Sequence, residues 1–249
     1  MFVPELMYEG GFQNSSEVIK LAFEHFGITP PATVYYPGSS RDISLIGIRG
    51  VDTIHADATL DEQQIGSFAL LGAEAHAVDV HEWRPNQPLD AVVFINPAGI
   101  DESRVLAASD LVDGGLVLWA SWSGRPLLLK DAASLELVGV VNCDEDGALS
   151  IDQEDLDAYF QPKNFQDLSK VERQDFIGKL EHYLKANCLT LAINFSYEEL
   201  YEQLLQTKHP RNLAHLEHMG YAFPYSKTGT FFIFQKHPPH TEQPVIEAR

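Results

Sequence analysis

The segment Thr33-Val-Tyr-Tyr-Pro-Gly-Ser-Ser-Arg-Asp42 joins an apolar run to a tight turn of small residues, with an acid close behind. The run over residues 33–36 predicts a buried strand, because it is rich in β-branched and aromatic residues. Gly38 lacks a Cβ, so a ligand can come close to the backbone at this turn. The segment therefore predicts a strand that ends at a loop able to line a binding site.

The same alternation of strand and turn continues through the first half of the chain. Apolar runs rich in Val, Ile and Ala alternate with segments of helical periodicity. We expect strands at 33–36, 51–56, 73–78, 89–95 and 116–120, and helices at 14–26, 42–48, 61–71 and 101–111, the last stopped by Gly114-Gly115. Continuous apolar runs are typical of parallel strands that are covered on both faces. The pattern predicts an α/β fold, with a doubly wound, mostly parallel Rossmann-like sheet and helices on both faces.

The composition limits the partners and the compartment of the protein. The 249 residues include 17 Lys+Arg and 36 Asp+Glu, a formal net charge of -19, which disfavours bulk nucleic acid and anionic lipid. Two cysteines without a CxxC spacing and ten histidines without ligand spacing predict neither a disulfide framework nor a metal site. We find no signal peptide, and no stretch approaches the roughly 20 apolar residues of a membrane helix. We expect a cytoplasmic protein, and its oligomeric state stays open.

Several polar or small residues follow the predicted strands. In doubly wound sheets, ligands bind beyond the carboxyl ends of the strands. Gly38, Ser39 and Ser40 follow the first strand, and Asp57 follows the second, at about the twenty-residue spacing of acids that bind ribose hydroxyls. Asp79 follows the third strand, where a carboxylate can accept from the exocyclic amine of a base. The first loop lacks both the full G-x-G-x-x-G and the lysine of a P-loop, so a cofactor without phosphates, such as S-adenosylmethionine, suits it best.

These segments together resemble class I S-adenosylmethionine-dependent methyltransferases from residue 33 to about residue 235. "VYYPGSSRD" is similar to the first motif of that family, and Asp57 and Asp79 match the acids after its second and third strands. "LDAVVFINPAGI", "LVDGGLVLWAS" and "LEHMGYAFPYSKTGTFFIFQK" resemble its fourth strand, its fifth strand and its closing helix and hairpin. Two departures stand out: the first loop has a single glycine, and Asn96-Pro97-Ala-Gly99 lacks the second proline and the aromatic residue of enzymes that methylate the amino groups of bases.

The resemblance implies an enzyme that transfers a methyl group from S-adenosylmethionine to a small-molecule or protein acceptor. It implies that Asn96 faces the transferred methyl group. The implied cofactor-binding residues are Tyr36, Pro37, Gly38, Ser39, Ser40, Asp42, Asp57 and Asp79. Three of these residues have a structural alternative: Asp42 suits a helix start, Asp57 suits a helix cap, and Asn96 suits a turn before proline.

The resemblance also implies a domain organisation. It predicts an N-terminal helix in 1–32, the cofactor-binding half in 33–122, a mainly helical insertion or lid in 123–196, closing elements in 197–236 and a flexible tail in 237–249. Within the second half, we expect a hairpin of 135–141 and 148–151, helices at 166–187, 196–206 and 213–219, a short segment at 221–225, and a strand at 230–235. Either 135–151 or 221–235 forms the final hairpin of the sheet.

Two other functions remain open. The first alternative is a methyltransferase-like binding or scaffold protein that has lost turnover. The single glycine of the loop after the first predicted strand favours this alternative. A nicotinamide-dependent oxidoreductase is the weaker alternative, because the dinucleotide glycines are missing.

Overall fold

The computed structural model describes residues 15–97, 99–120, 129, 132, 134–143, 148–161, 164–186, 196–206 and 230–237. The chain divides into two compact units. The first comprises Met1–Trp119, Leu128–Val138 and Phe232–Arg249, and the second comprises Ala120–Leu127 and Gly139–Phe231. The helix expected at 213–219, the segment 221–225 and nearly all of the expected tail lie outside the described residues.

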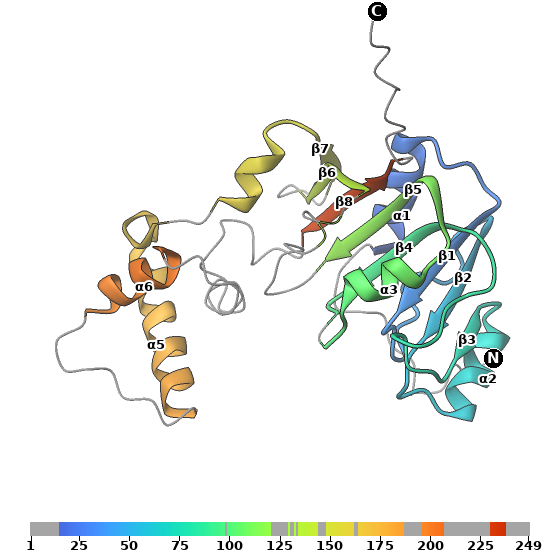
Figure 1. Cartoon of the computed structure of the whole chain (residues 1–249), viewed down its shortest axis with the longest axis horizontal. Coiled ribbons are helices and arrows are strands. Elements are labelled where there is room, and N and C mark those ends of the chain that lie inside the picture. Colours follow the sequence, from blue (N-terminus) through green and yellow to red (C-terminus); the bar gives the residue numbers. More distant parts are fainter. Residues whose placement is uncertain are drawn as a thin grey trace, which may run out of the picture. The chain divides into compact units, whose positions relative to one another are not determined.

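The described strands form one sheet of eight strands in the order β3-β2-β1-β4-β5-β8-β6-β7 (Figure 1). Their bounds are β1 Ala32–Pro37, β2 Val51–Ala56, β3 Glu74–His76, β4 Leu89–Ile95, β5 Leu111–Ala120, β6 Leu135–Cys143, β7 Leu149–Asp152 and β8 Phe231–Lys236. β1 runs parallel to both β2 and β4, and β2 runs parallel to β3. The parallel pairing around β1 confirms the predicted α/β class.

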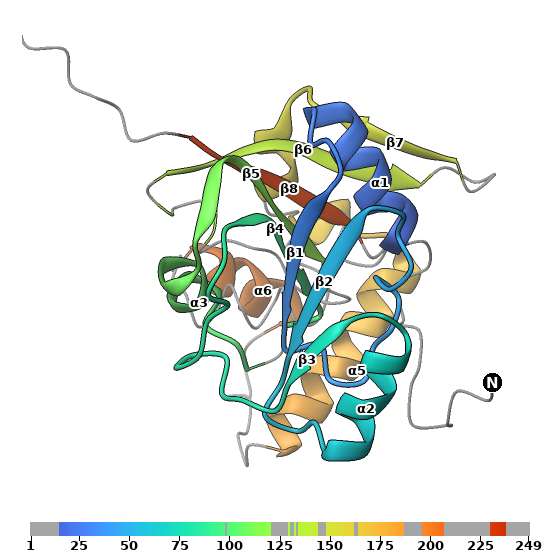
Figure 2. The same ribbon diagram turned by 90° about the vertical axis from the view of Figure 1, so that its right-hand side faces the viewer.

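Three helices cover the sheet of the first unit: α1 Ser15–Phe26, α2 Glu62–Leu70 and α3 Glu102–Ala108. Figure 2 shows α1 and α2 on one side of the strands and α3 on the other. Helix α2 begins at a capping box, in which the side chains of Asp61 and Gln64 each accept from the other residue's backbone N–H. Helices on both faces agree with a doubly wound sheet.

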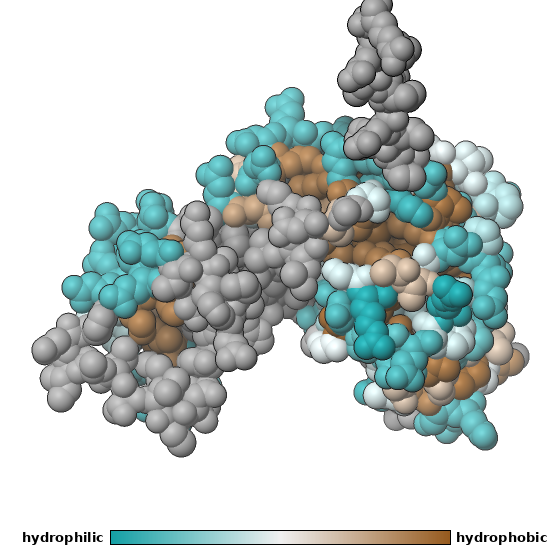
Figure 3. Space-filling model, viewed as in Figure 1, coloured by the Kyte–Doolittle hydropathy of each residue, from teal (hydrophilic) through white to brown (hydrophobic). Residues whose placement is uncertain are grey.

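The core of the first unit lies in its central strands. Val92, Val93 and Phe94 of β4 are fully buried, as are Ile233 and Phe234 of β8. These continuous apolar runs leave no strand face for water, as expected for a sheet covered on both sides. In Figure 3, this face of the unit shows apolar residues in patches between hydrophilic ones. None of the described helices has the length and apolar character needed to cross a membrane.

The helix predicted at 42–48 is wrong, since this segment forms a series of turns. The Asp42 carboxylate accepts from the Ser44 backbone N–H at 2.8 Å and from the Tyr36 hydroxyl at 2.9 Å. Local side-chain bonds of this kind compete with helix formation. Leu45 and Ile48 are buried at this segment.

The boundary predicted between the helix at 101–111 and the strand at 116–120 is also wrong. α3 ends at Ala108, and β5 already begins at Leu111, so Gly114 and Gly115 lie inside the strand. A Cβ on Gly115 would stand 3.1 Å from the Asp90 carbonyl oxygen of neighbouring β4. Glycine at this position therefore allows β5 and β4 to approach closely. In the sequence, the same Gly-Gly pair is also typical of the end of a helix. The third strand is shorter than predicted, Glu74–His76 instead of 73–78.

The second unit contains the paired residues of the predicted hairpin and a small helical cluster. β6 and β7 pair antiparallel from Val140↔Asp152 to Cys143↔Leu149, which confirms the hairpin. Beyond it lie two short 3-10 helices, η1 Leu156–Phe160 and η2 Phe165–Asp167, followed by α5 Lys170–Ala186 and α6 Tyr197–Gln206. The rings of Phe165, Phe176 and Tyr201 pack together with centroids 5.1–5.7 Å apart.

Strands from both ranges proposed for the final hairpin belong to the sheet. β8 comes from 221–235 and lies between β5 and β6, and β6 comes from 135–151. The segment 123–196, expected to be a mainly helical insertion, therefore also supplies strands β6 and β7.

Candidate functional site at the carboxyl edge of the sheet

The strand order places a switch point between β1 and β4. The chain passes from β1 to β2 on one side of this point and from β4 to β5 on the other. Loops that leave such neighbouring strands in opposite directions open a crevice, where ligands of doubly wound sheets bind. Gly38 follows β1 and Asn96 follows β4, so these two predicted residues flank the switch point.

Gly38 connects the loops on the two sides of the switch point. Its N–H donates to the Ala56 carbonyl at 2.7 Å, and its φ of 68° lies in the left-handed region that favours glycine. A Cβ at this position would overlap Cδ1 of Ile100, which comes from the loop after β4. Gly38 therefore allows the two loops to touch, and its own φ excludes a larger residue.

Asp57 holds the loop after β1. Its Oδ2 accepts from the Ser40 N–H at 2.9 Å, and its Oδ1 accepts from the N–H and the hydroxyl of Thr59 at 2.7 and 2.6 Å. Ser40 has a φ of 47°, a left-handed conformation stabilised here by the carboxylate. The structure thus brings together two of the predicted site residues. Because a carboxylate oxygen accepts up to two hydrogen bonds, Oδ2 keeps capacity for one more donor.

The other residues predicted in this loop lie mostly in the interior. Tyr36 and Asp42 are both 2% exposed and are hydrogen-bonded to each other, and Pro37 is also buried. Ser39 is 1% exposed, and its hydroxyl has no hydrogen-bond partner among the described residues. The roles proposed for these four residues stay predictions.

His81 links Asp79 to the start of α3. The Asp79 Oδ1 accepts from the His81 backbone N–H at 2.9 Å and lies 3.0 Å from its Nδ1. The backbone hydrogen bond from His81 is the main cause that lowers the pKa of Asp79 below its usual value. The Asp101 N–H donates to His81 Nε2 at 3.0 Å. This arrangement assigns the neutral tautomer, with the proton on Nδ1, and connects the loop after β3 to the loop after β4.

Asn96, the predicted catalytic residue, is exposed at the end of β4. Its φ of 48° is one that asparagine tolerates better than most residues. The backbone then turns sharply, since the Ile100 N–H donates to the Pro97 carbonyl at 3.1 Å. Asn96 therefore lies at the crevice, and its catalytic role stays a prediction.

Two polar groups near this edge were missed by sequence reasoning. Glu102 accepts from Trp119 Nε1 at 3.0 Å, and burial raises the pKa of its carboxyl group. His55 of β2 is fully buried against Phe68 of α2, with ring centroids 4.4 Å apart, and burial lowers its pKa to about 3. Glu102 follows a helix-capping aspartate and resembles any acid of a first helical turn. His55 lies in an apolar run, so neither pattern gave a functional signal.

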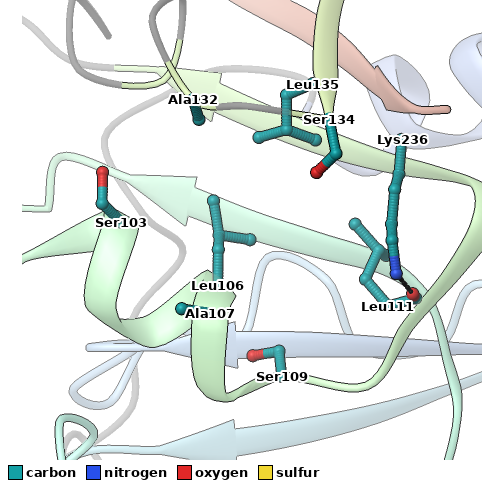
Figure 4. A pocket seen from close by; sticks show the side chains of 9 residues that line it. All are labelled: Ser103, Leu106, Ala107, Ser109, Leu111, Ala132, Ser134, Leu135 and Lys236. Carbon is teal, nitrogen blue, oxygen red and sulfur yellow. Dashed lines mark hydrogen bonds between the residues drawn. The ribbon is translucent and has the colours of Figure 1, made fainter. Parts of the chain in front are cut away.

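A separate cavity of about 220 Å³ lies along α3 and beside the start of β5 (Figure 4). Its lining residues are Ser103, Leu106, Ala107, Ser109, Leu111, Ala132, Ser134, Leu135 and Lys236. The Lys236 ammonium donates to the Leu111 carbonyl at 2.5 Å and lies 3.8 Å from Asp113. This cavity contains none of the predicted site residues.

No protein-family model matches the chain, and no curated protein sequence matches it. Several solved structures are similar to it. A SAM-dependent methyltransferase from Thiobacillus denitrificans in complex with S-adenosyl-L-homocysteine has 14% identity and a TM-score of 0.44, over 94% of this chain and 95% of that one. The corresponding protein from Geobacter sulfurreducens, also with S-adenosyl-L-homocysteine, has 13% identity and a TM-score of 0.42, over 90% and 91%.

The N-methyltransferase NodS from Bradyrhizobium japonicum WM9, in complex with S-adenosyl-L-homocysteine, has 12% identity and a TM-score of 0.34. That match covers 45% of this chain and 64% of NodS. The roles of individual residues in this chain rest on the geometry described above.

Proposed function

We propose that this protein binds S-adenosylmethionine at the carboxyl edge of its sheet and transfers the methyl group to a small-molecule or protein acceptor. The observation that carries the proposal is the switch point between β1 and β4, with Gly38 on one side and Asn96 on the other. In a doubly wound sheet this is where a nucleotide-type ligand binds.

The chemistry of the first loop favours a cofactor with a ribose but without phosphates. The loop contains one glycine and no lysine, so it lacks the glycine-rich backbone cradle and the lysine of a P-loop. Asp57 lies at its edge and Oδ2 keeps room for a ribose hydroxyl. The unpartnered hydroxyl of buried Ser39 is a further polar group in the same loop.

The proposed reaction depends on alignment more than on particular side chains. The bound cofactor supplies an electrophilic methyl group, and this chain has to hold the acceptor in line with it. Asn96, exposed at the end of β4, is the residue we propose to face the reacting atoms. The formal net charge of -19 favours a neutral or cationic acceptor over an anionic one.

A second candidate is a methyltransferase-like binding protein without turnover. The observation that favours it is that the predicted ribose-binding carboxylate already has partners within the protein. Ser40 donates to one oxygen of Asp57, and Thr59 donates to the other. Ile100 also packs on Gly38, where a more open loop would receive the ligand.

Thermal unfolding with added ligands tests the proposal. A ligand that binds only the folded protein raises Tm in a concentration-dependent way. We expect S-adenosylhomocysteine to raise Tm at millimolar concentration and NADH to leave it unchanged. No shift with S-adenosylhomocysteine contradicts the proposal, and a shift with NADH alone supports the oxidoreductase alternative. Binding of S-adenosylmethionine without methyl transfer to any acceptor favours the second candidate.

A further inference from the structure

The start of α3 is attached to several loops of the carboxyl edge. Ile100 packs against Gly38 in the loop after β1. The next residue, Asp101, donates its N–H to His81 in the loop after β3 and caps α3 by accepting from the Arg104 N–H at 3.1 Å. The first turn of α3 is therefore positioned by the loops after β1 and β3.

Glu102 is the first residue of α3, and its carboxyl group is held in place from the sheet. Trp119, the next-to-last residue of β5, is 4% exposed and donates its Nε1–H to Glu102 Oε1 at 3.0 Å. The backbone N–H of Glu102 itself also interacts with the carboxyl group. A half-buried carboxyl group thus stands at the carboxyl ends of β4 and β5 with Oε1 held by Trp119, and its two oxygens together keep capacity for a further hydrogen bond.

The surroundings of Glu102 favour proton uptake. Burial raises the pKa of the carboxyl group, hydrogen bonds from Trp119 and from the Glu102 backbone N–H oppose this effect, and the nearby Asp101 carboxylate raises the pKa further. Asp101 is the charged group that acts on Glu102 among the described residues. A partly buried carboxylate of this kind has a higher proton affinity than a carboxylate in water. It is therefore better suited to act as a general base.

We propose that Glu102 accepts the proton that the methyl acceptor loses, and that the acceptor is therefore a neutral hydroxyl or amine. This inference rests on the proposed function. A lone pair of the acceptor oxygen or nitrogen attacks the methyl carbon, and the carbon–sulfur bond breaks with its electrons passing to sulfur. The acceptor proton passes to Glu102 Oε2, and the thioether product is neutral. Trp119 is a positioning residue in this scheme, because it acts only through Glu102.

The charge difference between S-adenosylmethionine and S-adenosylhomocysteine tests the proposal without knowledge of the acceptor. The first carries a positive sulfonium where the second carries a neutral thioether, so an ionised carboxylate beside the methyl group favours the first. The preference is measured by calorimetry as the ratio of the two Kd values, from about pH 5 to about pH 8. We expect this preference to rise about tenfold as Glu102 ionises, the effect of two unit charges within roughly 10 Å at a protein surface.

Three variants and one control test whether the pH dependence of this preference comes from Glu102. Glu102→Gln keeps an acceptor for Trp119 and should make the preference independent of pH, whereas Glu102→Asp should retain the dependence. Glu62→Gln is the matched control, since Glu62 also follows a capping aspartate at the start of a helix but is exposed. Trp119→Phe should move the midpoint to higher pH, because the carboxylate loses its donor; a purely structural role of Trp119 predicts no such movement.

The outcomes separate this inference from the function on which it rests. A preference that does not change with pH in the wild type, or that changes equally in Glu102→Gln, overturns the role of Glu102 and leaves cofactor binding intact. If neither ligand binds, the proposed function fails, and the inference fails with it.

Discussion

Helices α2 and α3 begin in the same way on opposite sides of the sheet (Figure 2). Each starts with an Asp-Glu pair, and each aspartate accepts from the backbone N–H three residues later, at 2.8 Å in α2 and 3.1 Å in α3. The local pattern is therefore shared, and it produces the same helix start twice.

The packing beneath the two helices differs. On the α2 side, fully buried Phe68 packs on the His55 ring, and Glu62 is exposed to solvent. On the α3 side, Glu102 turns toward the sheet and binds Trp119. Tertiary packing, which the local pattern does not encode, thus decides that one acid is a surface charge and the other belongs to a candidate site.

The largest difference should appear in the packing of the two faces. Phe68→Ala should lower the free energy of unfolding by about 3–5 kcal/mol, because it leaves a cavity over His55. Val105→Ala, at the 1% exposed position of α3, removes less volume and should cost about 2 kcal/mol. Urea unfolding of both variants measures the two values. A smaller loss at Phe68 than at Val105 would mean that the α2 face is not the more tightly packed one.

The second difference between the two sides of the sheet concerns how folding stability depends on pH. Burial lowers the pKa of His55 to about 3 in the folded state, so the unfolded chain, with an ordinary histidine pKa of about 6.5, binds the proton first as the pH falls. The folded protein is therefore fully stable with respect to His55 above about pH 7, and it loses stability as the pH falls below about 6.5. The expected loss between about pH 7.5 and about pH 5 is about 2 kcal/mol.

His55→Leu should remove this dependence, whatever its own effect at neutral pH. His25→Gln, at an exposed histidine of α1, should leave it intact. Urea midpoints at several pH values measure the slope for each variant. An unchanged slope in His55→Leu would show that another group is responsible for the acid sensitivity.

The smallest effects should come from the helix caps. Asp61→Ala and Asp101→Ala should each cost about 1 kcal/mol, because each removes the side chain that satisfies a free N–H of the first turn. Thermal unfolding compares the two. Losses that differ by more than about 1 kcal/mol would show that tertiary contacts, and not the shared cap, hold one of the helices.

Much of the first unit was predictable because its signals are local. β2 and β4 have the predicted bounds, and both capping aspartates lie where the sequence placed the helix starts. The turn at 42–48 and the strand interior at Gly114-Gly115 were mispredicted. In both cases a contact between segments, Tyr36 with Asp42 and β5 with β4, decides the conformation.

The candidate site was predictable in its position but only partly in its composition. Strand order and the residues after each strand led to Gly38, Asp57 and Asn96. The contact of Ile100 with Gly38 and the bond from Trp119 to Glu102 join residues brought together by folding. A single sequence gives no spacing rule for such pairs.

Calorimetric titration with S-adenosylhomocysteine tests the central claim, that the carboxyl edge of the sheet binds the cofactor. We expect binding to the wild type and at least about tenfold weaker binding to Asp57→Asn, because this substitution weakens a charge-assisted hydrogen bond to ribose. Asp52→Asn is the matched control, because Asp52 is an exposed aspartate at the opposite end of β2, and it should bind like the wild type. Absence of binding to the wild type, or equal binding to all three proteins, would show that the cofactor does not bind at this edge through Asp57.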